Sequence, residues 1–406
     1  MKKILFFTNS FPYPPGEQFI ETEIRYWSGL PKVEVILVPS KIDGKPRVIP
    51  DDINIINGTV RPNKFINAFR ALFSSLLWKE LCWLSENGKL NRKSAFIVLK
   101  GTAVTLSWKY RIKKILKTTG GADIAYCYWN SNAAYGACLV KAEGEISAVI
   151  TRAHRCDLYE YQQPENYMPL KRQLRDLFDK VYSISEDGVD YLKSVYGFSD
   201  EKVNIARLGV KIPSKYGTPS SDGVIRVCSA SFCVPVKRIE IIIQSIRIFG
   251  VNYPEKKIQW THFGGGPLEQ SLKKYAFETL RGIDNVSYSF VGMVDNLTIL
   301  QHYESKPVDV FINTSESEGV PVSIMEAMSY GIPTIAPAVG GVSEIVNNNN
   351  GAILDIYCHS NDIVDSIIRL TGDNRDELRC AARAKIKKDY SASKNYKKFV
   401  SDFIPK

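Results

Sequence analysis

The chain has 406 residues, of which 44% are hydrophobic and 24% are charged, and its formal net charge is +10 at pH 7. This length and composition are those of a soluble globular protein with two domains, each large enough to have its own core. No uninterrupted apolar run is long enough to cross a bilayer, and the apolar residues 4–7 are too few for the apolar region of a signal peptide.

The eight cysteines predict reduced thiols. They form no C-x-x-C pair and no zinc-like grouping with the four histidines. Reduced thiols are typical of the cytoplasm, so we expect a cytoplasmic enzyme.

The positive charge is concentrated in the first half of the chain. Residues 1–215 hold 32 Lys and Arg against 22 Asp and Glu, whereas residues 216–406 hold 21 of each kind. A one-sided basic domain indicates an anionic partner such as a membrane surface, a lipid-linked pyrophosphate or a nucleic acid. A solvated basic surface that keeps the protein soluble explains the same numbers. No nucleic-acid module is recognisable and the basic residues are dispersed, so we expect no nucleic-acid partner.

The first half of the chain alternates apolar strands with helices. We expect strands at residues 4–7, 33–38, 53–56, 122–128, 148–153 and 180–184, and residues 203–208 lead out of this half of the chain. Helices are expected at residues 17–27 and 63–84 and after the capping residues 185–188. The turn at residues 9–16 has one glycine and three prolines, so it is not the G-x-G-x-x-G loop of a nicotinamide or flavin enzyme.

The expected helix at residues 63–84 is amphipathic, with a basic polar face and two nearby tryptophans. Such a helix can lie in a membrane interface, or it can pack on its own sheet. The basic segment 109–117 presents the same two alternatives.

His154 follows the expected strand at residues 148–153. Ligands of α/β proteins bind at the carboxyl ends of parallel strands, so His154 is a candidate ligand contact. A buried structural histidine is the alternative interpretation.

A segment rich in Pro, Gly and Ser at residues 213–223 predicts the linker between the domains. Strands are expected after it at residues 225–230, 258–263 and 286–290. Lys237 and Arg238 open the helix at residues 239–249, and a glycine-rich turn follows the second of these strands.

The most informative stretch is 311–346, which predicts a strand, a polar loop, a helix, a second strand and a turn that opens another helix. This βαβα unit directs a loop and two helix N-termini to one place, which is a suitable site for an anion. Glu318 in the loop and Glu326 in the first turns of the helix also lie there. A nucleotide sugar satisfies both features, because carboxylates accept hydrogen bonds from hydroxyls while backbone N–H groups hold a diphosphate.

This stretch resembles the donor-site signature of the retaining glycosyltransferases of family 4, which have the GT-B fold. The matching positions are Glu318-Gly319-Val320-Pro321, Glu326-Ala327-Met328, Gly331-Ile332-Pro333 and Gly340-Gly341 with Glu344. The resemblance is dense in the second half of the chain and looser in the first. It implies an α/β protein with two Rossmann-like domains, each with a parallel sheet, that face each other across a cleft. The implied divisions are an acceptor-binding domain at 1–212, a linker at 213–223, a donor-binding domain at 224–388 and a final helix at 389–406 that returns to the first domain.

The resemblance also implies residue roles. Catalytic roles fall on Glu318, Lys237 and His154, where the histidine faces the transferred sugar. Candidate acceptor contacts are Pro15, Gly16, Glu17 and Gln18, each of which is otherwise a turn residue or a helix cap. Donor-binding roles fall on Glu326, Arg238, Gly319, Val320, Pro321, Val322, Gly264, Gly265, Met293, Val294, Gly340 and Gly341.

Two positions depart from the family pattern. The arginine that the family has five residues before Lys237 is Phe232 here, which puts one diphosphate contact in doubt unless Arg238 compensates. Arg155 replaces the small residue that usually follows the histidine.

The implied activity is that of a metal-independent hexosyltransferase-type enzyme (EC 2.4) that uses a nucleotide diphosphate sugar and no cofactor. The expected acceptor is a lipid-linked oligosaccharide of a bacterial surface polysaccharide, with the protein in the cytoplasm or peripheral on the inner face of the plasma membrane. A catalytically silent GT-B protein that binds sugar nucleotides or glycans is the alternative, prompted by Phe232.

Overall fold

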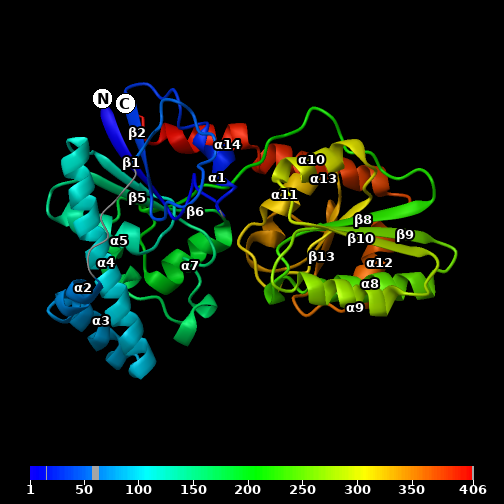
Figure 1. Ribbon diagram of the computed structural model, residues 1–406, viewed down its shortest axis with the longest axis horizontal. Coiled ribbons are helices and arrows are strands. Elements are labelled where there is room, and N and C mark those ends of the chain that lie inside the picture. The colour runs from blue at the N-terminus through cyan, green and yellow to red at the C-terminus, as the bar shows by residue number, and fades with distance from the viewer. Residues whose placement is uncertain (15, 57–63, 405–406) are drawn as a thin grey trace. The chain divides into compact units, whose positions relative to one another are not determined.

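The computed structural model describes residues 1–14, 16–56 and 64–404. The chain divides into two compact units (Figure 1). Unit 1 comprises Met1–Arg207 and Tyr396–Lys406, and unit 2 comprises Leu208–Asn395. Among the residues described, no helix combines the length and the apolar character that crossing a bilayer requires.

Unit 1 contains a parallel sheet of seven strands in the order β3-β2-β1-β4-β5-β6-β7. The strands are β1 (Lys2–Thr8), β2 (Val33–Pro39), β3 (Asn54–Ile55), β4 (Ile124–Cys127), β5 (Ala148–Ala153), β6 (Lys180–Ser183) and β7 (Val203–Ile205). The α-helices are α1 (Ile20–Ile24), α2 (Lys64–Leu72), α3 (Ser75–Glu86), α4 (Arg92–Thr119), α5 (Asn132–Ala142), α6 (Lys171–Leu174), α7 (Glu186–Tyr196) and the end of α14 (Ala392–Ser401). Short 3₁₀ turns are η1 (Glu160–Gln162), η2 (Pro164–Asn166) and η3 (Arg175–Leu177).

Both faces of the unit 1 sheet are buried. Alternate residues of β1 point to opposite faces, and each set packs in its own apolar cluster. Leu5 and Phe7 pack in one apolar cluster with residues of α4, α5 and α7. Ile4 and Phe6 pack in the other cluster with residues of α1 and with the C-terminal Phe399. The helix α14 is thereby part of the unit 1 core, where each fully buried phenylalanine contributes about 1.5–3 kcal/mol.

The expected helix at residues 63–84 is two helices, which corrects the prediction. α2 ends at Leu72 and α3 begins at Ser75, because the side chain of Ser74 accepts a hydrogen bond from the N–H of Leu76 (3.3 Å) and caps α3. The expected helix at residues 17–27 is also shorter, since α1 covers only Ile20–Ile24.

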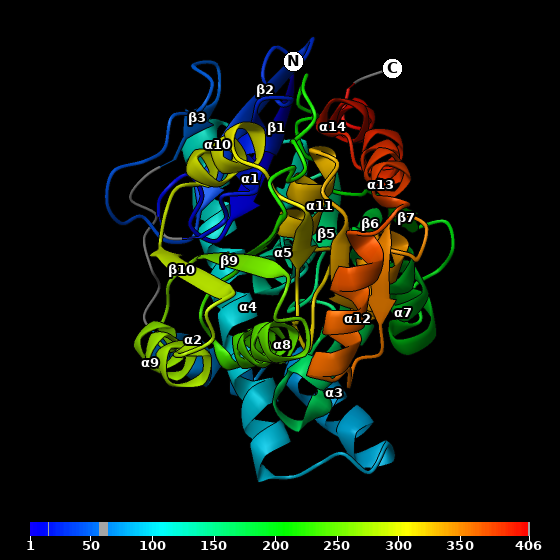
Figure 2. The same cartoon turned by 90° about the vertical axis from the view of Figure 1, so that its right-hand side faces the viewer.

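Unit 2 contains a parallel sheet of six strands in the order β10-β9-β8-β11-β12-β13. Its strands are β8 (Val224–Ala230), β9 (Lys257–Phe263), β10 (Val286–Gly292), β11 (Val310–Ile312), β12 (Thr334–Pro337) and β13 (Gly351–Leu354). Its helices are α8 (Ile239–Asn252), α9 (Glu269–Leu280), α10 (Asn296–Ser305), α11 (Val322–Ser329), α12 (Ser360–Leu370) and α13 (Arg375–Asp389), with 3₁₀ turns η4 (Pro235–Lys237) and η5 (Gly340–Glu344). Helices α8, α9 and α12 cover one face of this sheet, and α10, α11 and α13 cover the other (Figures 1 and 2).

The segment expected as a linker is bound to unit 2. Arg379 donates a hydrogen bond to the carbonyl of Gly217 (2.6 Å), and Arg383 donates one to the carbonyl of Lys215 (2.8 Å). Both arginines belong to α13 and are buried. These side chains hold residues 215–217 on α13, so this part of the segment is ordered although its composition is that of a flexible connection.

Candidate functional site

An ion pair lies at the carboxyl edge of the unit 2 sheet. Lys237 ends η4, after β8, and Glu318 lies in the loop between β11 and α11. Because β8 and β11 are neighbours in a parallel sheet, the loops that follow them leave the same edge. The Nζ of Lys237 lies 2.5 Å from the Oε1 of Glu318, and Asn313 Nδ2 donates to the same oxygen (3.3 Å). Glu318 is only 9% exposed, so a paired charge is held at an edge where ligands of α/β proteins bind.

Arg238, the residue after Lys237, has a positive φ of 48°. The Nε of Arg238 donates a hydrogen bond to the carbonyl of Thr314 (2.8 Å). The Oγ1 of Thr314 in turn donates one to the carbonyl of Lys237 (2.8 Å). The Nη2 of Arg238 is buried and has no hydrogen-bond partner among the residues described. A buried guanidinium nitrogen without a partner is costly, and an anionic ligand would satisfy it. Phe232, which stands where the family has an arginine, is 52% exposed.

The glycine turn at Gly340 and Gly341 packs against the loop that carries Glu318. The N–H of Gly341 donates to the carbonyl of Gly319 (2.7 Å). A Cβ at Gly340 would lie 2.2 Å from the carbonyl oxygen of Glu318, so only glycine fits there. The turn opens η5, so the helix that the sequence predicts there is a 3₁₀ helix of five residues.

Glu326 lies on α11, and its Oε1 accepts a hydrogen bond from Asn296 Nδ2 (2.8 Å) at the start of α10. Burial raises the pKa of Glu326 to about 7, and the bond from Asn296 acts in the opposite direction. The charge of this carboxyl group therefore changes near neutral pH.

We expect donor binding to weaken as the pH falls below about 7. The family resemblance assigns the ribose of the donor to Glu326. An ionised carboxylate can accept two hydrogen bonds from ribose hydroxyls, whereas a protonated one accepts fewer, so we expect a donor to bind the ionised form better. At about pH 6 roughly one tenth of the carboxyl is ionised, so binding should be weaker than at high pH by up to about tenfold. Isothermal titration of a sugar nucleotide across this range measures the effect. Glu326→Gln should remove the pH dependence, and an unchanged slope in that variant would contradict the assignment.

The glycine-rich turn after β9 lies against the end of β10. The N–H of Gly264 donates to the carbonyl of Gly292 (2.9 Å), and a Cβ at Gly265 would lie 3.4 Å from the backbone nitrogen of Met293. Met293 is 60% exposed and is followed by the half-buried Val294. The structure thus brings together both segments to which the family resemblance assigns nucleotide contacts.

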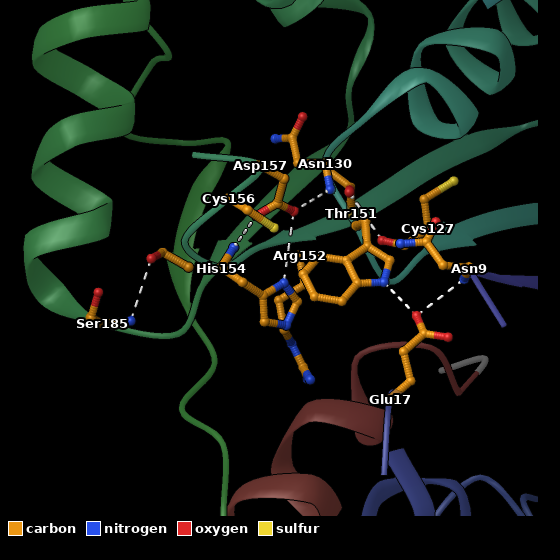
Figure 3. A network of polar contacts seen from close by, with 12 residues as sticks. Asn9, Glu17, Cys127, Asn130, Thr151, Arg152, His154, Cys156, Asp157 and Ser185 are labelled. Atoms are coloured by element: carbon orange, nitrogen blue, oxygen red, sulfur yellow. Dashed lines mark hydrogen bonds and ion pairs between the residues drawn. The ribbon is translucent and has the colours of Figure 1, made fainter. Parts of the chain in front are cut away.

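In unit 1, His154 follows β5 and is buried, with only 6% of its surface exposed. Its backbone N–H donates to Asp157 Oδ1 (2.7 Å), and Asp157 Oδ2 accepts from the N–H of Asn130 (2.7 Å), as Figure 3 shows. Burial alone would raise the pKa of Asp157, but the contacts with His154 and the charge of Lys171 outweigh it and lower the pKa. Asp157 stays ionised and joins the ends of β4 and β5.

The four residues expected to contact an acceptor differ in their surroundings. Pro15 lies outside the described residues. The carbonyl of Gly16 accepts a hydrogen bond from Arg47 Nη1 (3.0 Å), and Gln18 is exposed. The Glu17 carboxylate points back to the end of β1, where it accepts hydrogen bonds from the backbone.

Sequence reasoning did not single out Asn313, Asn296 or Trp129. Asn313 directly follows β11 and Trp129 comes two residues after β4, so their positions at strand ends were a usable signal. Asn296 bonds to Glu326 from the start of α10, 30 positions away in sequence, and no local pattern marks it. Asp157, by contrast, follows His154 by only three positions.

Among the residues described, no group of three or more His, Cys, Asp and Glu side chains is arranged to hold a metal ion.

Comparisons with known proteins relate the chain to glycosyltransferases. The family model "Glycosyl transferases group 1" matches residues 217–388. The amylovoran biosynthesis glycosyltransferase AmsK of Erwinia amylovora is 24% identical over 215 residues, which are 50% of this chain and 51% of AmsK. The chain therefore matches only about half the length of this relative.

Two solved structures are similar over 99% of this chain and 99% of their own chains. One is the apo form of the lipopolysaccharide outer core galactosyltransferase WaaB (TM-score 0.69, 18% identity). The other is Anabaena Alr3699/HepE in complex with UDP and glucose (TM-score 0.64, 15% identity). At these identities the likeness concerns the fold.

Proposed function

Because this chain belongs, through residues 217–388, to the group 1 glycosyl transferases (family 4) and has the GT-B fold, we propose that it is a retaining glycosyltransferase. It transfers a sugar from a nucleotide diphosphate sugar to a glycan acceptor of a bacterial surface polysaccharide. The observation that carries the proposal is the Lys237–Glu318 pair, with Asn313 and the unpartnered nitrogen of Arg238 beside it.

The reaction breaks the bond between the sugar C1 and the β-phosphate oxygen and forms a bond from C1 to the acceptor oxygen on the same face. The proton of the acceptor hydroxyl passes to the departing phosphate, so no strong protein base is required. Negative charge grows on the β-phosphate as the bond breaks, and fixed positive groups stabilise that charge. Lys237 and Arg238 supply them, and the proposal needs no metal ion.

The remaining groups hold the donor. Glu318 accepts hydrogen bonds from the sugar hydroxyls, Glu326 from the ribose, and His154 meets the transferred sugar. The segments at Gly264–Gly265 and Met293–Val294 hold the nucleotide, and residues 319–321 lead into α11, which begins at Val322 and receives the phosphates at its N-terminus. Gly340 has no Cβ to collide with the carbonyl of Glu318, and the N–H of Gly341 bonds to the carbonyl of Gly319, so both glycines hold the Glu318 loop beside Lys237.

A transfer assay over UDP, GDP and ADP sugars with glycan acceptors tests the proposal. Turnover of one donor, with the product anomer unchanged in configuration by NMR, is the expected result. Binding of a donor without transfer or hydrolysis would instead favour the silent sugar-nucleotide-binding protein that Phe232 suggests.

We further propose that the lipid-linked acceptor is met at an anionic membrane surface through α2 and α3. Phe69 (64% exposed) and Phe73 (75%) contact each other with ring centroids 5.0 Å apart, and Trp78 (57%) donates a hydrogen bond to the carbonyl of Leu72 at the end of α2. The exposed Arg70 and Lys79 lie on the same two helices. Exposed aromatic groups bordered by cations fit the interface of a bilayer that contains anionic lipids.

The double variant Phe69→Ser and Phe73→Ser should lose flotation with vesicles that contain phosphatidylglycerol. Each phenylalanine contributes up to about 1.5–3 kcal/mol when it leaves water, so affinity should fall at least tenfold. Phe277→Ser is the matched control, because Phe277 is 59% exposed but lies on α9 in unit 2. Failure of the unmodified protein to float at low salt would refute membrane docking.

A further inference from the structure

The carboxylate of Glu17 is enclosed at the end of β1. Its Oε1 accepts from the N–H of Asn9 (3.1 Å), and its Oε2 accepts from the N–H groups of Ser10 (2.6 Å) and Phe11 (2.6 Å). Glu17 is only 6% exposed, and its φ of 53° is unusual for a residue with a side chain. Three successive N–H groups around one carboxylate form an anion-binding nest, and the protein fills it with its own side chain.

The same carboxylate holds Trp129. The indole Nε1 donates to Glu17 Oε1 at 2.5 Å, across 112 positions of sequence. Trp129 follows β4, so the bond ties the loop after β1 to the loop after β4. Figure 3 shows the neighbouring bond from Asn9 to the same Glu17 carboxylate. A short bond between an N–H and an ionised group is among the stronger hydrogen bonds in proteins.

Trp129 lies against the imidazole of His154. Their ring centroids are 4.6 Å apart, and Tyr128 stacks on the imidazole at 4.7 Å. His154 Nδ1 is 3.7 Å from Asp157 Oδ2, which is too long for a hydrogen bond, and neither ring nitrogen has a hydrogen-bond partner among the residues described. Aromatic packing, together with the long contact between Nδ1 and the Asp157 carboxylate, therefore sets the direction of this ring.

We propose that Glu17 is a positioning residue, which fixes Trp129 against His154 and so directs an imidazole nitrogen to a hydroxyl of the transferred sugar. The inference rests on the proposed function and deepens it. A buried imidazole with two unsatisfied nitrogens costs free energy unless a ligand bonds to it, so the site is prepared for a hydroxyl. Both oxygens of Glu17 are engaged with the protein, which favours this role over the direct acceptor contact that the family resemblance suggests.

A mutant cycle tests the proposal. Glu17→Gln removes the charge, and Trp129→Phe keeps an aromatic ring but removes the N–H donor. Each should lower kcat by about tenfold or more, because small displacements of a contact group reduce rates strongly. The double variant should be no slower than the slower single variant, and neither change should reduce kcat further in a His154→Ala background. Equal losses from Glu17→Gln in the His154→Ala and unmodified backgrounds would overturn the proposal.

NMR of the ring signals gives a readout that does not depend on activity. In Glu17→Gln the indole N–H resonance of Trp129 should move upfield and the ring signals of His154 should shift. The matched control Glu34→Gln, on β2 with its carboxylate 3.8 Å from Lys3, should leave both unchanged. If the Trp129 or His154 signals do not move in Glu17→Gln, the proposed coupling is refuted, whether or not the protein turns over a donor. If the signals move but the protein turns over no donor, only the proposed function is contradicted.

Discussion

Lys237→Ala is expected to lower kcat for sugar transfer by about a hundredfold to a thousandfold. Lys237 is the cation proposed to stabilise the charge that grows on the departing β-phosphate, and loss of one such group has an effect of this size. The donor KM should change less than kcat, because the charge develops mainly in the transition state. Steady-state kinetics with the donor found in the panel measures both values.

Two controls separate this effect from disruption of the fold. Lys237→Ala leaves Glu318 nearly buried without its ion-pair partner, so thermal unfolding must be measured beside the kinetics. Lys273→Ala removes a lysine that pairs with Glu269 (2.6 Å) on α9, and it should leave kcat unchanged. If Lys237→Ala reduced kcat by less than threefold or so, the transition-state role of Lys237 would be wrong.

Gly340→Ala is expected to reduce kcat by about a hundredfold and to destabilise unit 2. The residue has a φ of 50°, and a Cβ would meet the carbonyl oxygens of Glu318 at 2.2 Å and Gly319 at 3.2 Å. The Glu318 loop must move to relieve this overlap, and a shift of about 1 Å in a contact group can cost about a hundredfold in rate. The conformational strain adds roughly 1–2 kcal/mol to the loss of stability.

Gly282→Ala is the matched control for Gly340→Ala. Gly282 also has a positive φ, 78°, but a Cβ there would meet no atom within 4 Å. It should therefore show the strain cost in thermal unfolding without the loss of kcat. Similar kinetics for the two variants would mean that the contact with the Glu318 loop is unimportant for transfer.

Most of the fold could be predicted from the sequence, because buried parallel strands are continuous apolar runs. The runs at residues 4–7, 258–263 and 310–312 lie in β1, β9 and β11, and the expected two-domain GT-B fold is confirmed. The break between α2 and α3 could not be predicted from apolar spacing, since it depends on one capping serine in an uninterrupted amphipathic pattern. The helix expected after the Gly340-Gly341 turn is the short 3₁₀ helix η5, and its packing against the Glu318 loop is a tertiary contact that the sequence does not show.

The candidate site could be predicted in part. Motif spacing marked Glu318 and Lys237, and the structure brings their side chains into contact. Motif spacing could not reveal that Arg238 keeps one nitrogen without a partner or that Asn296 bonds to Glu326, because both features depend on residues distant in sequence. The bond between Glu17 and Trp129 is of the same kind.

A crystal structure with a bound sugar nucleotide tests the central claim most directly. We predict diphosphate oxygens within hydrogen-bond distance of Lys237 Nζ and Arg238 Nη2, the sugar hydroxyls on Glu318 and the ribose hydroxyls on Glu326. A nucleotide bound with its diphosphate away from Lys237, or with neither carboxylate on a hydroxyl, would contradict the account.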